Sequence, residues 1–293
     1  MFNYNEAFSR NLGIVSEDEQ VKLKNARIGI AGLGGVGGSH ILTHARMGIA
    51  NFNIADMDIF EIQNFNRQAG ALCSTINRSK VDVMKEMVLD INPEANINIF
   101  PNGLSDDNLD QFLEGVDVLI DGLDFFVFDI RQKMHKRARE KKIPVIAAGP
   151  IGCGVSLTIY TPDSMSWDYF FGVSLIKEEI DKTILFYLGN SPTGIHQSYI
   201  DSSRIKLEEK KGPSIAPAVQ LCSGFAAIES MKLILKRGNI LPVPYFHQFD
   251  VYKNKYICRR LPFGNRGIIQ RLKLFLIRKK IKQMQNLTKP ESD

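Results

Sequence analysis

The 293-residue sequence contains few cysteines, and none of them lie close together. The four are Cys73, Cys153, Cys222 and Cys258, and no CxxC pair is present. A zinc ribbon or a disulfide framework needs cysteines at short, regular spacings. The sequence therefore predicts neither kind of site, and a reducing compartment is the expected environment.

Long apolar runs are also missing, and no leader segment is expected from the residues at the start. No stretch of about 18 apolar residues, which would predict a membrane-spanning helix, occurs in the chain. The start, MFNYNEAFSR, has no apolar segment behind a basic end. The composition, 44% hydrophobic and 24% charged, is typical of a globular protein. We expect a cytoplasmic location, with peripheral membrane association as the alternative.

Acidic residues are scarce near the C-terminus. Between positions 266 and 293, eight basic residues stand against two acidic ones, a net charge of +6. The whole chain carries +5, so the remaining residues together are near −1. The basic character therefore belongs to the tail and not to the body. The eight are Arg266, Arg271, Lys273, Arg278, Lys279, Lys280, Lys282 and Lys289, against Glu291 and Asp293.

Apolar strand patterns alternate with helical patterns up to about residue 150. Strands are predicted at 27–31, before Asp56, at NINIF, at VDVLIDGLD and at IPVIAAGPIG, with helical spacing between them. This alternation predicts an α/β fold with a doubly wound, mostly parallel Rossmann-like sheet, whose ligands bind at the carboxyl ends of the strands. After Cys153 the alternation weakens, and YFHQFDVYKNKYICRRL predicts a hairpin, an antiparallel C-terminal extension.

The segment GLGGVGG, between the first strand and the first long helix, matches the pattern GxGxxG. Its glycines permit a tight turn and let a phosphate approach the N-terminus of the helix, where free N–H groups favour anions. An acidic residue, Asp56, stands nineteen positions after Gly37, where a ribose-binding carboxylate is expected. A nucleotide site is therefore predicted. The glycines concerned are Gly32, Gly34, Gly35, Gly37 and Gly38.

A polar block follows that aspartate. The sequence DMDIFEIQNFNRQ resembles the corresponding block of the ThiF/MoeB and ubiquitin-activating enzyme superfamily, approximately D-x-D-x-V-x-x-S-N-L-x-R-Q. Gln63 stands where that family usually has Ser, and Phe65 where it has Leu. The resemblance extends to FSRNLGIVSEDEQ, NRSKVDVMKE, VLIDGLDFF and the later PSIAPAVQLCSGFAAIESMKLIL. The matching residues are Asp56, Asp58, Asn64, Arg67 and Gln68 in the block, with Arg10, Lys80 and Asp124 outside it.

The resemblance implies a Mg-ATP-dependent adenylyltransferase, in which a substrate carboxylate attacks the α-phosphate and pyrophosphate leaves. An anion that attacks a triphosphate needs fixed cations and a metal ligand to offset the developing charge. By resemblance, Asp124 would bind magnesium, and Arg10 would reach the γ-phosphate of ATP in a neighbouring protomer, so a homodimer is expected. Asp56 would bind the ribose hydroxyls, and Asn64, Arg67 and Lys80 the phosphates.

The expected substrate also comes from the resemblance. It is the C-terminal glycine of a small ubiquitin-like or sulfur-carrier protein, although related enzymes activate peptides or modified tRNA bases. The chain departs from the family where zinc-binding CxxC pairs are usual, because TPDSMSWDYFF occupies the place of the first pair, and no zinc is predicted. Segment 191–213, the expected crossover loop, contains no cysteine. With Cys153 and Cys222 expected in the core, adenylation without an enzyme thioester is favoured.

Two other functions remain open at this point. A NAD- or FAD-dependent oxidoreductase would explain the glycine motif and Asp56, but not Asn64, Arg67, Lys80 and Asp124. A catalytically idle nucleotide-binding scaffold, recruited through the tail, would not need the last three of these residues.

Several other residue groups have ordinary structural interpretations. His40 and His44, one turn apart on the helix after the glycines, are expected to be packed or to face a dimer partner. Trp167 and the aromatic residues after it are expected in the core or in a dimer contact. The basic helix at 129–142 is interpreted as a solvated outer face.

The predicted organisation is an adenylation domain over residues 1–262 and a basic amphipathic tail over 263–293. The domain divides into an N-terminal helical segment (1–26), a nucleotide-binding core (27–150) and a crossover loop with the C-terminal part (151–262). Within 266–284, apolar and basic residues alternate at helical spacing. This tail is expected to dock on the body or a partner, or to lie on an anionic membrane. No aromatic-interleaved basic sheet motif favours nucleic acid.

Overall fold

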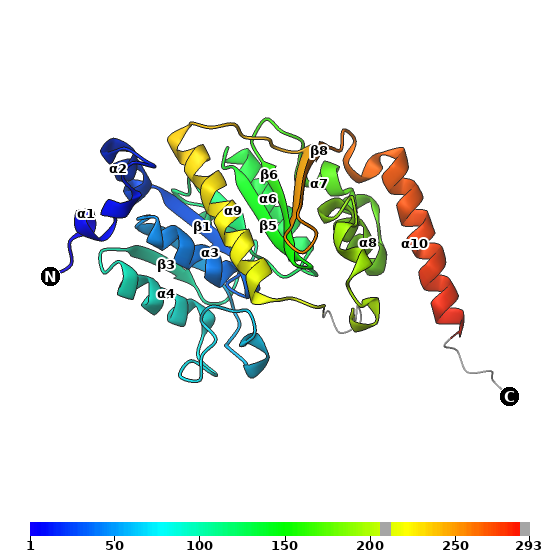
Figure 1. The fold of residues 1–293 in the computed structure, drawn as a ribbon, viewed down its shortest axis with the longest axis horizontal. Coiled ribbons are helices and arrows are strands. Elements are labelled where there is room, and N and C mark those ends of the chain that lie inside the picture. Colours follow the sequence, from blue (N-terminus) through cyan, green and yellow to red (C-terminus); the bar gives the residue numbers. More distant parts are fainter. Residues whose placement is uncertain (206–211, 288–293) are drawn as a thin grey trace.

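In the computed structural model, an eight-stranded sheet runs through the molecule and helices cover both of its faces (Figure 1). The structure describes residues 1–205 and 212–287. Positions 206–211 of the expected crossover loop, and Lys289, Glu291 and Asp293 of the tail, lie outside the described residues.

The sheet has the strand order β3-β2-β1-β4-β5-β6-β7-β8. The first five strands are parallel, and the last three continue the sheet in antiparallel pairs. The predicted doubly wound, mostly parallel sheet with an antiparallel C-terminal extension is confirmed. The strands are β1 (Arg27–Ala31), β2 (Asn51–Ala55), β3 (Asn96–Phe100), β4 (Val118–Asp121), β5 (Val145–Ile151), β6 (Gly154–Tyr160), β7 (Tyr245–Asp250) and β8 (Lys255–Arg260).

The order of the strands locates the ligand crevice. Successive strands lead outward from β1 to β2 and β3, and the chain then returns to β4 on the other side of β1. Such a reversal opens a crevice at the carboxyl ends of the two central strands. In this chain those ends are Ala31 of β1 and Asp121 of β4, which are paired in register.

One face of the sheet is covered by α3 (Gly35–Arg46), α4 (Lys80–Ile91) and α9 (Ala216–Leu235), with α2 (Glu17–Asn25) packed on α9. Strand β4 is buried on both faces, because Val118 and Ile120 join this core while Leu119 joins the opposite one. Helix α9 is long and apolar enough to cross a membrane, but it packs along α3, β5 and β6 as a core helix.

The opposite face is covered by α5 (Leu109–Phe112), α6 (Asp129–Glu140), α7 (Trp167–Phe171) and α8 (Glu179–Asn190). The interpretation of residues 129–142 as a solvated face is wrong for one side of α6, where Arg131, Met134, His135 and Ala138 are buried. That side faces aromatic side chains of α7 and α8, because His135 packs against Trp167 and Arg131 lies over the Phe186 ring. Trp167, Phe170 and Phe171 are buried as expected, whereas Tyr169 is exposed.

Short helices and the two ends of the chain complete the fold. At the N-terminus, α1 (Tyr4–Ala7) and the 3-10 helix η1 (Ser9–Asn11) pack at the C-terminal end of α3, where the Tyr4 hydroxyl donates to the Gly48 carbonyl over 2.6 Å. At the other end, α10 (Ile268–Leu287) packs against α8. The remaining 3-10 helices are η2 (Ile62–Asn64), η3 (Val173–Leu175), η4 (Ile195–Ser198), η5 (Ser202–Arg204) and η6 (Gly264–Arg266).

Candidate active site

The glycine turn joins β1 to α3 through backbone contacts that only glycine permits. Gly32 has φ +86°, and a Cβ placed there would lie 2.5 Å from the carbonyl oxygen of Gly122, just beyond β4. A Cβ on Gly37 would collide with the carbonyl oxygen of Gly32. The ends of β1 and β4 and the first turn of α3 therefore meet without side chains between them, at the crevice located above.

No side chain caps the N-terminus of α3. Its N-cap residue is Gly34, which makes no side-chain hydrogen bond to the helix. The first N–H groups of a helix have no intrahelical partner, and the helix dipole favours negative charge there. This first turn can therefore receive a phosphate group, as the glycine pattern predicts.

Asp56, directly after β2, is fixed beside the glycine turn. Its carboxylate accepts one hydrogen bond from the Leu33 N–H over 2.6 Å and another from the Asp58 N–H over 2.8 Å. A carboxylate has about four acceptor positions, so this group retains capacity for the hydroxyls of a ribose. Burial raises the pKa of Asp56 above its usual range, while the positive charge of Lys80 and the two N–H groups act in the opposite direction.

Lys80, the first residue of α4, supplies a cation at the same edge. Its side chain is only 6% exposed, and its Nζ donates to Asp58 Oδ2 over 3.0 Å, whereas the Asp58 side chain is 63% exposed. An ammonium group has three donors, and this contact uses one of them. Because the Asp58 carboxylate is readily hydrated, a phosphate oxygen can compete with it for the Lys80 ammonium.

The polar block around η2 lies beside the glycine turn. A Cβ on Gly35 would be 3.7 Å from Arg67 Nε, and a Cβ on Gly34 would be 3.8 Å from Gln68 Nε2. Arg67 Nη1 donates only to neutral oxygens, the Gln63 carbonyl at 3.1 Å and Asn66 Oδ1 at 2.9 Å. The guanidinium group is therefore held in place by contacts that leave its charge to act on an anion.

Asn64 has a different environment from its neighbours in the block. It is buried, and its Oδ1 accepts from the Glu61 N–H over 3.0 Å, so this side chain shapes the η2 turn. Its predicted phosphate contact would have to come from the amide nitrogen, because only the NH2 group can donate to a phosphate oxygen.

Asp124 stands in the loop after β4 with its carboxylate exposed. Its Oδ1 accepts from the Phe126 N–H over 3.1 Å. The buried Arg131 fixes this loop from below, because its Nη2 donates to the Leu123 carbonyl at 2.6 Å and the Asp124 carbonyl at 2.9 Å. Magnesium in nucleotide sites is held by one or two carboxylates together with phosphates and water, and an exposed carboxylate on a fixed backbone fits that requirement.

Arg131 is itself held by a buried acid. Its Nε donates to Asp121 Oδ2 over 2.9 Å, and His135 Nε2 lies 3.0 Å from the same oxygen. Burial acts to raise the pKa of Asp121, but Arg131 and His135 together lower it to about 2. Burial lowers the pKa of His135. Asp121 is therefore ionised, and the three side chains form a buried support for the loop that carries Asp124.

This buried support is not among the residues predicted from the sequence. A signal is present, because Asp121 ends an otherwise apolar buried strand, and Arg131 and His135 stand four residues apart, on one side of α6. The many other basic residues of α6 concealed it, since they indicated a solvated outer face and gave no sign that one basic residue, Arg131, is buried on the inner side.

Arg10 is not brought to this site within one chain. It is exposed on η1, beside Asn11, whose Nδ2 donates to the Met47 carbonyl at the C-terminal end of α3. The glycine turn is at the other end of α3, and twelve helical residues span about 18 Å. Arg10 could act on a nucleotide only in a second copy of the chain.

The cysteines differ in their surroundings. Cys222 is fully buried and burial raises the pKa of its thiol, so the core interpretation is right for this residue. The same interpretation is wrong for Cys153, which is partly exposed in the turn between β5 and β6, where its N–H donates to the Tyr199 hydroxyl over 2.7 Å. Because β5 is parallel to β4, this turn lies at the carboxyl edge of the sheet.

The histidines on α3 are packed, as expected. His44 Nδ1 lies 2.7 Å from the His40 carbonyl, and its Nε2 lies 2.9 Å from Ser230 Oγ on α9. Within residues 1–205 and 212–287, no group of three or more His, Cys, Asp or Glu side chains is placed to hold a metal ion. The absence of zinc stays a prediction.

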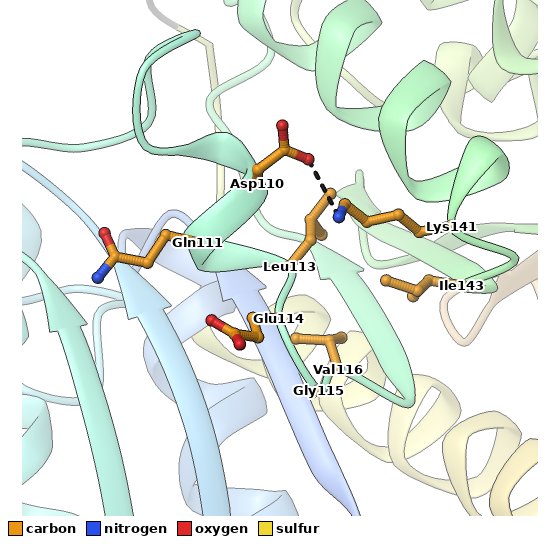
Figure 2. A pocket seen from close by; sticks show the side chains of 8 residues that line it. All are labelled: Asp110, Gln111, Leu113, Glu114, Gly115, Val116, Lys141 and Ile143. Atoms are coloured by element: carbon orange, nitrogen blue, oxygen red, sulfur yellow. Dashed lines mark ion pairs between the residues drawn. The ribbon is translucent and has the colours of Figure 1, made fainter.

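A surface cavity lies at the other edge of the sheet (Figure 2). Figure 2 shows side chains from α5 and from the segments before β4 and β5 around it, including Val116 and Ile143. At its rim, Lys141 Nζ and Asp110 Oδ1 form an ion pair of 3.1 Å. Because these segments precede their strands, the cavity is at the amino edge and is separate from the glycine turn.

Comparison with known proteins agrees with this geometry. The ThiF family model matches residues 8–266. A tRNA threonylcarbamoyladenosine dehydratase of Bacillus subtilis is 34% identical over 142 residues, which are 48% of this chain and 55% of that protein. A molybdopterin-synthase adenylyltransferase of Haemophilus influenzae is 26% identical over 231 residues, 78% of this chain and 82% of that protein. The chain spans about half the length of the curated dehydratases it matches.

Solved structures share the fold. Escherichia coli MccB, crystallised with AMPCPP and MccA, superposes with a TM-score of 0.63 at 22% identity, over 84% of this chain and 66% of that chain. The same protein with ATP also gives a TM-score of 0.63, at 20% identity, over 86% and 69% of the two chains.

Proposed function

Since the chain belongs to the ThiF family, we propose that it is a Mg-ATP-dependent adenylyltransferase that activates a carboxylate as an acyl-adenylate and releases pyrophosphate. One observation carries this proposal. The glycine turn, Asp56, Lys80, Arg67 and Asp124 converge on the carboxyl edge of β1, β2 and β4. An oxidoreductase would use only the first two of these features.

The nucleotide would bind with its ribose on Asp56 and its phosphates over the first turn of α3. Arg67 flanks that turn and Lys80 lies beside Asp58 at the same edge, so both can stabilise negative charge as the carboxylate attacks the α-phosphate. Magnesium, when bound, would offset further charge on the phosphates. The role of Asp124 would be to hold that ion, and the role of Arg131 to keep Asp124 in place.

The proposed substrate is the C-terminal glycine of a small ubiquitin-like or sulfur-carrier protein. Support comes from the adenylyltransferase relative that is matched over 82% of its length. MccB, which has the same fold, is crystallised with MccA. A peptide or a modified nucleoside is the alternative carboxylate donor, and the dehydratase relatives favour the second of these.

A homodimer would complete the site. Arg10 is exposed and lies at the far end of α3 from its own glycine turn. A second copy could direct this arginine at the γ-phosphate, as the family resemblance implies. The test is complementation, because a mixture of Arg10→Ala and Arg67→Ala subunits would then regain part of the activity that each variant lacks.

An enzyme thioester is not part of the proposal. Cys222 has no access to solvent, and a thiolate is disfavoured at its buried position. Cys153 is partly exposed near the carboxyl edge, and Cys73 is exposed in the segment between Arg67 and Lys80. Cys73→Ser and Cys153→Ser should therefore each retain pyrophosphate exchange.

The experiment that tests the proposal is ATP–pyrophosphate exchange with magnesium, measured alone and with candidate carriers that end in Gly-Gly. Exchange should fall about 100-fold or more in Arg67→Ala and Asp124→Ala, the effect typical of removing one group that stabilises transition-state charge. Matched controls are Arg137→Ala on the amino-edge side of α6 and Asp90→Ala on α4, and both should exchange normally. Absence of exchange together with preferential NAD binding would contradict the proposal.

A further inference from the structure

Helix α10 has apolar residues on two opposite faces, and only one of these faces is packed. On the packed face, Gln270 is 1% exposed and its Nε2 donates to the Leu188 carbonyl of α8 over 3.0 Å. Arg278 on the same helix forms an ion pair with Asp181 of α8. Figure 1 shows α10 at the periphery of the molecule, with α8 beside it. Docking of the tail on the body, one of the predicted alternatives, thus explains only the packed face of α10.

The other side, which we call the outer face of α10, is open. Its five large apolar side chains are 54–87% exposed. Steps of one, three and four residues between them keep all five within about a third of the helix circumference. Isolated exposed apolar residues are ordinary, but a continuous stripe of this kind indicates a binding surface. The five are Ile268, Ile269, Leu272, Phe275 and Leu276.

The exposed charged residues of α10 and its N-terminal flank are basic. Arg266, Arg271 and Lys279 are exposed on or next to α10, while Asp181 of α8 is already paired with Arg278. The sequence contains no acidic residue from position 251 to position 290. Any partner must therefore offer both an apolar phase and negative charge.

Anionic lipid meets both requirements. A second copy that docked through the same face about a twofold axis would bring the two basic rims together, which is unfavourable. Nucleic acid would neutralise the basic rim, but it would leave the five apolar side chains in water. We propose that the outer face of α10 binds an anionic membrane surface, with the apolar side chains at the level of the headgroups and the basic residues against the lipid phosphates.

The helix would lie along the membrane and would not cross it. Four basic residues between positions 271 and 279 are incompatible with the hydrocarbon core, whereas they suit the headgroup region. Because α8 occupies the packed face, membrane binding would not require α10 to leave the body of the protein.

The test is co-sedimentation of the whole protein with vesicles of phosphatidylcholine alone and with 30% phosphatidylglycerol. Binding should require the anionic lipid and should weaken as salt rises from 0.1 to 0.5 M. The double variant L272E/F275E should lower the partition coefficient more than about tenfold. Arg271→Gln should lower it about fivefold, the ratio that corresponds to about 1 kcal/mol per basic residue.

The matched control is the double variant Ile14→Glu with Val21→Glu, which places two glutamates at exposed aliphatic positions away from α10 and should bind vesicles as the unmodified protein does. Thermal unfolding and pyrophosphate exchange of each variant show that the fold is intact. No binding to anionic vesicles at 0.1 M salt would overturn the proposal. Equal binding by the double variant, or dissociation of a dimer by it without any vesicle binding, would also overturn it.

Discussion

The parallel and antiparallel parts of the sheet differ in how much of their surface is buried. Every residue of β4 is buried, and helices cover both of its faces. Strand β8, at the other end, is an edge strand on which Lys255, Arg259 and Arg260 are exposed. A charged edge strand resists pairing with other chains. The parallel part thus places the proposed nucleotide site on a fully buried framework, whereas the antiparallel edge and α10 leave charged and apolar side chains exposed.

The largest effect on stability is expected at Arg131, which supports the parallel part of the sheet. Arg131→Leu should lower the free energy of unfolding by about 3–5 kcal/mol, because it leaves the Asp121 carboxylate charged, buried and without its main partner. Arg137→Leu, on the same helix, removes a solvent-exposed pair with Asp110 and should cost less than about 1 kcal/mol. Urea denaturation measures both. Equal losses of free energy in the two variants would show that the buried Asp121–Arg131–His135 contacts stabilise the fold no more than an exposed ion pair does.

The second effect concerns the glycine turn. Gly37→Ala should lower the free energy of unfolding by about 1–3 kcal/mol and abolish nucleotide binding, because its Cβ would collide with the Gly32 carbonyl. Gly224→Ala on α9 is the control, since a Cβ there meets no atom within 4 Å. Alanine in a helix interior should stabilise by up to about 1 kcal/mol. A Gly37→Ala protein that binds ATP normally would contradict the description of the turn.

The smallest effect is a gradual loss of stability in acid. Burial lowers the pKa of His40 to about 3 and of His44 to about 4, so both stay neutral in the folded state while the unfolded chain takes up protons below pH 6.5. Stability is therefore full above pH 6.5 and falls as the pH drops towards 4, by about 0.8 kcal/mol per histidine at pH 6.

His40→Leu would sharpen this test. No ring nitrogen of His40 makes a hydrogen bond of normal geometry among the described residues, although the backbone of Ala148 lies near the ring. A leucine of similar size should therefore be tolerated at pH 7.5 and should reduce the acid loss. Urea midpoints at pH 7.5 and pH 6 measure the effect. An unchanged acid loss in this variant would mean that other groups cause it.

The parallel part was predictable from the sequence because its signals are local. The glycine turn, Asp56 and Lys80 each lie at a strand end or a helix start, where the short-range sequence pattern also fixes their position in the fold. The Asp121–Arg131–His135 support was not predictable. Which side of α6 is buried depends on aromatic side chains of α7 and α8. Trp167 and Phe186 lie more than 30 residues after the residues of α6 that they contact.

The tail shows a second limit of sequence analysis. Both faces of α10 carry apolar residues, and nothing in the segment itself says which face meets α8. Contacts with residues distant in sequence, such as the ion pair between Arg278 and Asp181, determine which face packs against α8. The exposure of Cys153 was likewise unpredictable, because it depends on the tight β5–β6 turn and on Tyr199.

The most direct test of the account is ATP–pyrophosphate exchange by the unmodified protein, Arg67→Ala and L272E/F275E in solution, each supplied with magnesium and the carboxylate substrate. The account predicts that exchange is lost in Arg67→Ala and unchanged in L272E/F275E, since the chemistry resides at the carboxyl edge of the parallel strands. Normal exchange by Arg67→Ala would contradict the central claim.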